Sequence, residues 1–297
     1  QLREEQGKLE DILANPASLR RLMVKEIEAD AKQFQDARRT LIQAEKKAVA
    51  EVKIVDEPVT VVVSDKGWVR ARTGHGHEAG AFAFKAGDAL YATFECRSVD
   101  QLIVFGSNGR VYSVTVASLP GGRGDGQPIT TLIELETGTQ PSHYFAGPAT
   151  QTLLLAGTGG FGLLARVGDL VARQKGGKSF LSLEADEKPL PPTPADGATQ
   201  VACLSLAGRL LSFGIDELKL QPNGGRGLTL MDLDAKDALV SVAAFTQSLQ
   251  VLGIALRGGK PRDETLKGAA LNAYAGKRAR KGKAVEGMKA QRVVPAG

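Results

Sequence analysis

The sequence is poor in residue types that several protein classes require. Its 297 residues include only two cysteines, Cys96 and Cys203, and no Cys-x-x-Cys pair, a pattern typical of a reducing compartment and most simply the cytoplasm. Aromatic residues make up only 5% of the chain. No stretch approaches the roughly 20 apolar residues that span a bilayer, and the first residues lack the pattern of a signal peptide. We therefore expect a cytoplasmic protein without a membrane span.

Recognisable catalytic and metal-binding groupings are also missing. His75 and His77 stand two residues apart, but no further ligand has a metal-site spacing to them. The Gly-Lys-Ser at residues 177–179 lacks the preceding spaced glycine of a Walker loop. No nucleophile stands beside a candidate base. We therefore expect this chain to be non-catalytic, with no cofactor and no metal.

Charge is distributed unevenly along the chain. Residues 1–51 carry 10 basic and 10 acidic groups, residues 52–255 carry 17 and 20, and residues 256–297 carry 11 and 3. The C-terminal end is therefore basic, as is typical of proteins that contact phosphate polymers. An ordinary soluble surface is the alternative explanation.

The first 51 residues have a helical pattern. Asn15 followed by Pro16 is a favourable helix start. An apolar stripe then recurs at steps of three and four residues, through Leu19, Met23 and Ile27. Because the chain starts without Met and nothing downstream offers a helical partner, we interpret residues 1–51 as the end of a preceding helical domain of a longer protein. A local helix on the following domain is the alternative.

From residue 52 the sequence changes to repeated β-hairpins. A β-branched run at residues 59–63 ends in a glycine turn, and apolar runs at 102–105, 153–155, 201–204 and 251–254 do the same. The turn glycines are Gly67, Gly109, Gly160, Gly208 and Gly258, spaced by 42, 51, 48 and 50 residues, and the fifth copy is the weakest.

A second element repeats with the same period. Glycine-rich and usually basic blocks follow the hairpins at residues 74–77, 121–124, 173–178, 223–227 and 276–281. We expect strands after most of them, at 82–84, 129–135, 180–183 and 228–233. A proline-rich connector at 189–194 separates the third and fourth units. Two features repeating in register predict a mainly β, propeller-like disc of about five blades over residues 52–297.

The basic blocks suit a polyanion. Glycine lets a backbone approach a phosphate closely, and arginine and lysine add charge-assisted hydrogen bonds. Any single block is better explained as a solvated turn, but their recurrence in register favours phosphate contact along one rim. The candidate DNA-binding residues are Arg70, Arg72, Arg110, Arg123, Arg166, Arg173, Lys175, Lys178, Arg209, Arg226, Arg257, Lys260, Lys277, Arg278 and Arg280.

At these residues the chain resembles the C-terminal region of the A subunit of bacterial topoisomerase IV and, more distantly, that of DNA gyrase. The stretches that carry the resemblance are residues 26–40, 57–60, 85–88 and 169–173. The resemblance implies a β-pinwheel, a disc whose blades exchange strands, which binds and bends the transported duplex in decatenation and relaxation. It also implies three partners, namely duplex DNA, the catalytic half of the same polypeptide and the B subunit of topoisomerase IV. The implied location is the nucleoid, in chromosome segregation.

One departure separates the chain from gyrase. Gyrase tails carry a Gln-Arg-Arg-Gly-Gly-Arg/Lys-Gly box that permits wrapping, and the nearest stretch here, residues 174–178, is degenerate and lies in the third repeat. We therefore expect DNA bending without gyrase-like wrapping. Two rival classes remain, a propeller-type protein–protein interaction module, which usually has an aromatic-rich face, and an enzyme with a site in a central channel.

Overall fold

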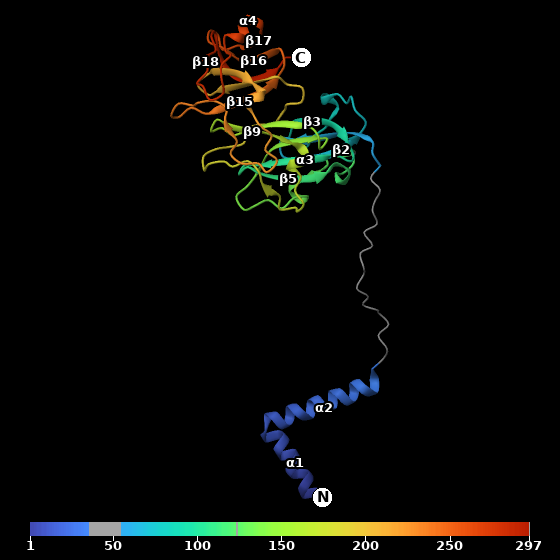
Figure 1. Cartoon of the computed structure of the whole chain (residues 1–297). Coiled ribbons are helices and arrows are strands. Elements are labelled where there is room, and N and C mark those ends of the chain that lie inside the picture. Colours follow the sequence, from blue (N-terminus) through green and yellow to red (C-terminus); the bar gives the residue numbers. More distant parts are fainter. Residues whose placement is uncertain (36–54, 123, 297) are drawn as a thin grey trace. The chain divides into compact units, whose positions relative to one another are not determined.

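The computed structural model describes residues 1–35, 55–122 and 124–296, and contacts divide the chain into two units, Gln1–Val52 and Lys53–Gly297 (Figure 1). The first unit contains helices α1 (Leu2–Ala14) and α2 (Pro16–Phe34). The Asn15 side chain accepts a hydrogen bond from the Ala17 N–H at 3.0 Å, and Pro16 begins α2, so the predicted helix start is confirmed. The predicted domain boundary at residues 51–52 lies outside the described residues and stays a prediction.

The α2 stripe has no partner among the described residues. None of the residues in α1 or α2 is buried, and Met23, Ile27 and Phe34 are more than half exposed. No described helix is both long and apolar enough to cross a membrane.

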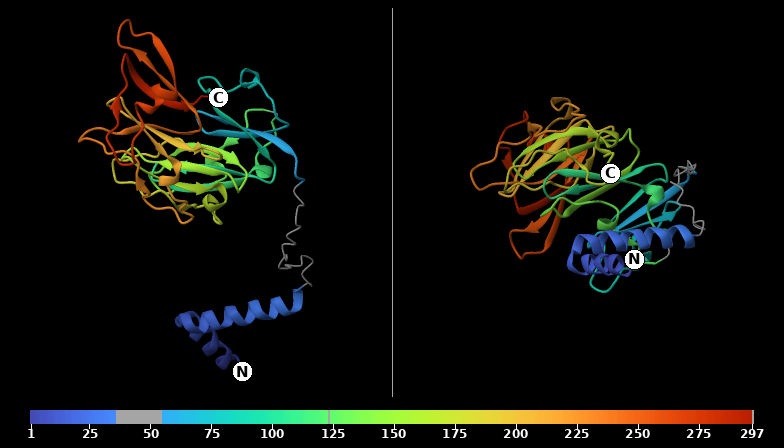
Figure 2. Two further views of the ribbon diagram at one scale, coloured as in Figure 1. Left: turned by 45° about the horizontal axis from the view of Figure 1, so that its top comes forward. Right: turned by 90° about the horizontal axis from the view of Figure 1, so that it is seen from below.

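The second unit is built from five antiparallel sheets, each centred on one predicted hairpin (Figure 1). The hairpins are β1 (Pro58–Ser64) with β2 (Trp68–Thr73), β4 (Gln101–Gly106) with β5 (Arg110–Thr115), β8 (Thr152–Ala156) with β9 (Phe161–Arg166), β12 (Gln200–Ser205) with β13 (Arg209–Gly214), and β16 (Ser248–Ala255) with β17 (Pro261–Lys267). The blades follow one another in chain order around the unit, from teal to red (Figure 2). The five-bladed β-pinwheel is confirmed.

Each hairpin is completed on its inner side by a later strand of the same repeat. These inner strands are β3 (Leu90–Arg97), β7 (Pro141–Gly147), β11 (Thr193–Pro194), β15 (Leu239–Phe245) and β19 (Met288–Pro295). Residues from all five line one cavity, which marks the centre of the pinwheel.

The outer side of each blade is completed by the next repeat. Two-residue strands β6 (Gln127–Pro128), β10 (Lys178–Ser179), β14 (Leu228–Thr229) and β18 (Lys283–Ala284) pair with β2, β5, β9 and β13 of the preceding blade. Within the described residues the fifth blade receives no such strand, so it has three strands and β17 forms its edge. Each exchanged strand therefore joins its own repeat to the preceding blade, so the five blades are linked in series.

The core lies between blades. Four buried apolar clusters each join two consecutive sheets, and alternate residues of one strand serve different clusters. Leu102 and Val104 of β4 pack toward the first blade, whereas Ile103 and Phe105 pack toward the third. Because both faces of the second, third and fourth blades are buried, the first hairpin strands β4, β8 and β12 are continuously apolar rather than alternating.

Most of the strands expected after the basic blocks are absent. Residues 82–84 and 129–135 form no strand, and a 3₁₀ turn (Ile129–Thr131) opens the second of these segments. Residues 180–183 hold only an isolated bridge at Leu181, and in 228–233 only the first two residues form a strand. The proline-rich stretch 189–194 is more than a connector, because its end forms β11, the inner strand of the third blade. Proline fits there because an inner strand pairs on one side only and needs few N–H donors.

The turn glycines occupy equivalent positions in four blades. Gly67, Gly109, Gly160 and Gly208 each have φ between 75° and 85° and directly precede the second hairpin strand. Gly258 also lies in its hairpin turn, with φ of 83°, but that loop is longer and β17 starts only at Pro261. The fifth repeat is thus the divergent one, as its sequence predicts.

The short helices α3 (Val167–Leu170) and α4 (Gly268–Asn272) follow β9 and β17. The remaining 3₁₀ turns are Ala79–Ala81, Val116–Ser118 and Ile215–Glu217.

Candidate nucleic-acid interface

The basic glycine-rich blocks lie on the outer side of the blades. Four of them, at residues 121–124, 173–178, 223–227 and 276–281, lead into or overlap the exchanged strands β6, β10, β14 and β18. These strands stand at the opposite end of each sheet from the central cavity. We call the exchanged strands and their blocks the rim. The first block, at residues 74–77, precedes no exchanged strand in the described chain.

Some rim glycines fit closely against the preceding blade. Gly177 has φ of 64°, and a Cβ added there would collide with the Val111 carbonyl oxygen of the preceding blade. Gly126, Gly227 and Gly282 stand at equivalent places against carbonyl oxygens of their own preceding blades. At Gly177 and Gly227, which belong to the basic blocks, the preceding blade occupies the space that a phosphate would need, whereas Gly121, Gly124 and Gly176 have no atom within 4 Å of an added Cβ.

Several candidate arginines bind the exchanged loops. The Arg110 Nη2 donates to the Gly176 and Gly177 carbonyl oxygens at 3.0 and 3.2 Å. The Arg209 Nη1 donates to the Gly282 oxygen at 3.4 Å, and the buried Arg70 donates to the Gly124 oxygen. These three side chains hold the loop of the following repeat against their own blade.

Arg226 and Arg278 lie in the loops before the exchanged strands and make similar contacts from there. Arg226 forms ion pairs with Glu184 and Glu187, both at 3.0 Å, and its guanidinium lies 4.2 Å from the centre of the Phe161 ring. Phe161 is the first residue of β9, the position that Arg110 takes in β5. In this blade the arginine therefore comes from the loop before the exchanged strand, and the hairpin strand supplies the residue that it contacts. Arg278 donates to the Thr229 oxygen at 2.6 Å. We call Arg70, Arg110, Arg209, Arg226 and Arg278 the latch arginines.

A second group of rim cations is exposed. Arg173 and Lys175 precede β10, and Lys277 and Arg280 precede β18. None of the four forms an ion pair with another described residue. Lys178 is different, because it is half-buried and donates to the Asp169 carbonyl oxygen at 2.6 Å.

The remaining candidates lie away from this group. Arg257 and Lys260 are exposed in the β16–β17 turn. Arg72 and Arg166 are exposed near the ends of β2 and β9, at the opposite end of those strands from the hairpin turns. Arg123 lies outside the described residues. The fifteen candidates therefore form no single surface.

Acidic turns adjoin the hairpin tips of the second to fourth blades. The acidic residues there are Glu134, Glu136, Glu184, Asp186, Glu187, Asp232, Asp234 and Asp237. Backbone hydrogen bonds of 2.8–2.9 Å tie these turns to the tips, for example from the Ser107 N–H to the Gln140 oxygen. Lys281 hydrogen-bonds to Asp234 and so lowers the pKa of that carboxyl group. These carboxylates disfavour a polyanion at the hairpin tips, and their turns reach the rim loops, since the Glu134 N–H donates to the Lys175 oxygen at 3.0 Å.

Two basic side chains were missed by the sequence reasoning. Lys283 is exposed on β18 itself, and it could have been found as the continuation of the basic run that starts at Lys277. Lys85 lies 3.6 Å from the centre of the Trp68 ring, a contact that sequence spacing does not indicate.

The tyrosines are packing residues, as expected. Tyr112 is completely buried. Tyr144 is also buried, and burial raises its pKa to about 12. Tyr91 hydrogen-bonds to His143 at 3.1 Å.

Comparisons with known proteins agree with the fold. A family model described as the DNA gyrase C-terminal domain, beta-propeller, matches residues 100–132 and 199–246. The chain is 36% identical to the DNA topoisomerase 4 A subunit of Neisseria gonorrhoeae over 291 residues, covering 94% of this chain and 37% of that protein. It is 32% identical to the same protein of Escherichia coli K12, covering 97% of this chain and 39% of that protein. The chain thus spans less than two fifths of the curated relatives that it matches.

Solved structures give the same result. The E. coli ParC C-terminal domain superposes with a TM-score of 0.71 and 30% identity, covering 80% of this chain and 98% of that one. A C-terminal domain of DNA topoisomerase IV gives a TM-score of 0.66 at 20% identity, covering 82% and 79% of the two chains, which supports the fold alone.

Proposed function

The chain belongs to the family of the C-terminal domain of the topoisomerase IV A subunit, and from that premise we propose that its β-pinwheel binds duplex DNA along the rim and bends it. The observation that carries the proposal is the group of exposed rim cations in the loops before β10 and β18 and on β18 itself, the exchanged strands that complete the second and fourth blades. These are Arg173, Lys175, Lys277, Arg280 and Lys283.

These side chains are available for phosphate contact because they have no ion-pair partner among the described residues. They carry positive charge at the outer ends of the sheets without ion pairs to other described residues. Lysine and arginine side chains without an ion-pair partner can donate charge-assisted hydrogen bonds to phosphate oxygens. Contacts to the DNA backbone carry little sequence information, so binding is expected to depend weakly on sequence.

In a complete enzyme the rim would present the transported duplex for decatenation and relaxation. That role requires two further partners, the catalytic half of the same polypeptide and the B subunit of topoisomerase IV. It also implies a cytoplasmic protein that works at the nucleoid during chromosome segregation.

The propeller-type protein-interaction module is less well supported. Few large apolar residues of the described pinwheel are exposed, namely Val55, Val99, Leu206, Leu220 and Leu256. Single exposed apolar residues are normal on a soluble surface and do not form a docking patch.

The test is a titration of duplex DNA with the full chain at several salt concentrations. Each phosphate neutralised contributes about −0.9 to the slope of log affinity against log salt, so we expect a slope of about −4 to −7. Reversing the charge of Arg173 and Lys175 to glutamate should weaken all duplexes alike and flatten the slope by about 2.

Lys188→Glu is the control, because Lys188 is exposed beside the acidic turns and does not belong to the exchanged strands or their basic blocks. It should leave the slope nearly unchanged. Equal losses in the double variant and in this control would show that general charge, rather than the rim, governs binding.

A further inference from the structure

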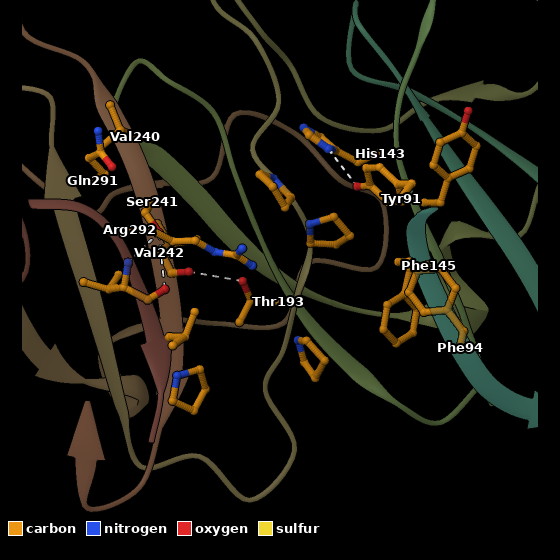
Figure 3. A pocket seen from close by; sticks show the side chains of 18 residues that line it. Tyr91, Phe94, His143, Phe145, Thr193, Val240, Ser241, Val242, Gln291 and Arg292 are labelled. Carbon is orange, nitrogen blue, oxygen red and sulfur yellow. Dashed lines mark hydrogen bonds between the residues drawn. The ribbon is translucent and has the colours of Figure 1, made fainter. Parts of the chain in front are cut away.

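The inner strands of all five blades enclose a cavity that the rim does not use. Its volume is about 690 Å³, which lies within the usual range for small-molecule sites. β3 and β7 form one side, β15 and β19 the other, and the proline-rich segment before and within β11 lies between them (Figure 3).

The wall is largely aromatic and aliphatic. The Phe94 and Phe145 rings pack edge to face with centroids 5.7 Å apart. Pro191 and Pro192 of the proline-rich segment and Val242 of β15 also line the cavity. Such surfaces favour a flat apolar ligand over water.

Most polar groups in the wall already have partners. The His143 Nε2–H donates to the Pro189 oxygen, and its Nδ1 accepts from the Tyr91 hydroxyl, both at 3.1 Å. The Thr193 hydroxyl donates to the Val242 oxygen at 3.3 Å, and the Ser241 hydroxyl donates to the Val293 oxygen at 3.3 Å.

Gln291 and Arg292, both exposed on β19, are the exceptions. Arg292 extends from β19 into the cavity and is the charged side chain of the lining (Figure 3). It forms no hydrogen bond or ion pair with the part of the chain that the structure describes, and no aspartate or glutamate lines the cavity. Burial raises the pKa of the Tyr91 hydroxyl, and the Arg292 charge opposes this rise.

We propose that the central cavity binds a small aromatic carboxylate. The guanidinium of Arg292 would hold the carboxylate through two parallel hydrogen bonds, the geometry that arginine favours. The aromatic body would lie against Phe94, Phe145 and the two prolines. A ligand in this place contacts several blades at once, so binding would also stabilise the pinwheel against unfolding.

Fluorine NMR titration of the full chain with para-(trifluoromethyl)benzoate tests the proposal. The neutral para-(trifluoromethyl)benzamide serves as the matched ligand without charge. We expect saturable binding of the benzoate, weakened at least fivefold by Arg292→Gln, and benzamide binding that is weaker and insensitive to the substitution. Arg292→Lys should retain part of the preference for the benzoate.

Lys289→Gln is the matched protein control, since Lys289 is exposed on the same strand but does not line the cavity. It should bind the benzoate as the parent chain does. The proposal is overturned if the parent shows no saturable binding, or if Arg292→Gln binds the benzoate like the parent or loses no more affinity than Lys289→Gln. Thermal unfolding of each variant without ligand shows whether the fold is intact. Duplex binding, measured in parallel, separates this site from the rim.

Discussion

His143 is a single side chain at which three blades meet. It is half-buried on β7, and its two ring nitrogens contact Tyr91 of the first blade and the Pro189 oxygen at the third. Burial lowers the pKa of the imidazole. The neutral ring fits this setting, because protonation would place an N–H at Nδ1 against a hydroxyl that donates its own proton there.

Acid should therefore destabilise the pinwheel through His143. A histidine whose pKa is lower in the folded than in the unfolded chain contributes no penalty well above about pH 6.5; the penalty grows as pH falls from about 6.5 to the folded pKa and is constant below it. We expect the melting temperature of the parent to fall more between pH 7.5 and 5.5 than that of His143→Gln, whose side chain does not titrate. An equal fall of the melting temperature in the two chains would show that His143 is not responsible for this pH dependence.

At the same scale, arginines that look alike in the sequence have two roles. The latch arginines donate to loop carbonyl oxygens or pair with carboxylates of their own chain, whereas Arg173 and Arg280 are exposed without such partners. A latch arginine is therefore a poor choice for testing DNA binding, because its loss would loosen the blade contact as well.

Among the elements, the exchanged strand is the one that joins neighbouring blades. Each has only two residues, too few to be stable alone, and it persists because the rim loop before it fits closely onto the preceding blade. Gly177 shows the constraint most clearly, since its positive φ and the nearby Val111 oxygen both exclude a side chain.

Gly177→Ala should therefore destabilise the pinwheel by about 2–4 kcal/mol, combining a left-handed backbone with overpacking. The neighbouring Gly176 is the matched control, because an added Cβ there meets nothing within 4 Å. Gly176→Ala should change stability by no more than about 0.5 kcal/mol. Urea unfolding measures both, and similar values for the two variants would refute the close-fit explanation.

For the whole molecule, the rim cations are discontinuous. Acidic turns adjoin the tips of the second to fourth blades, and the fifth blade receives no exchanged strand from the described residues. Bending a short duplex costs about 1–6 kcal/mol, which a few separated contacts can offset. A full wrap would require a continuous positive track.

We accordingly predict bending without strong wrapping. Ligation of nicked plasmid in the presence of the chain should give little change in linking number, while a short duplex should show a bend by fluorescence energy transfer between its ends. A large positive shift in linking number that rises with protein concentration would mean that residues 174–178 or the basic run 277–283 support wrapping after all.

The sequence determined the hairpins and their number. β-Branched and apolar runs followed by a glycine at positive φ are local signals, so residues 59–63 and Gly67, and the equivalent residues of the other repeats, could be assigned without the fold. The Asn15–Pro16 helix start is local in the same way. The family resemblance likewise followed from residues in their linear order.

Only the tertiary structure decided which strands complete each blade, because those pairings depend on blades packing together. Arg110 and Gly176 are 66 residues apart, and nothing near either one shows that they meet. The same holds for the prolines that become an inner strand and for Arg292, which faces a cavity that exists only when five blades assemble around it. Which arginines are latched and which are exposed therefore depends on contacts between repeats, and these are set by the burial of each blade between its neighbours.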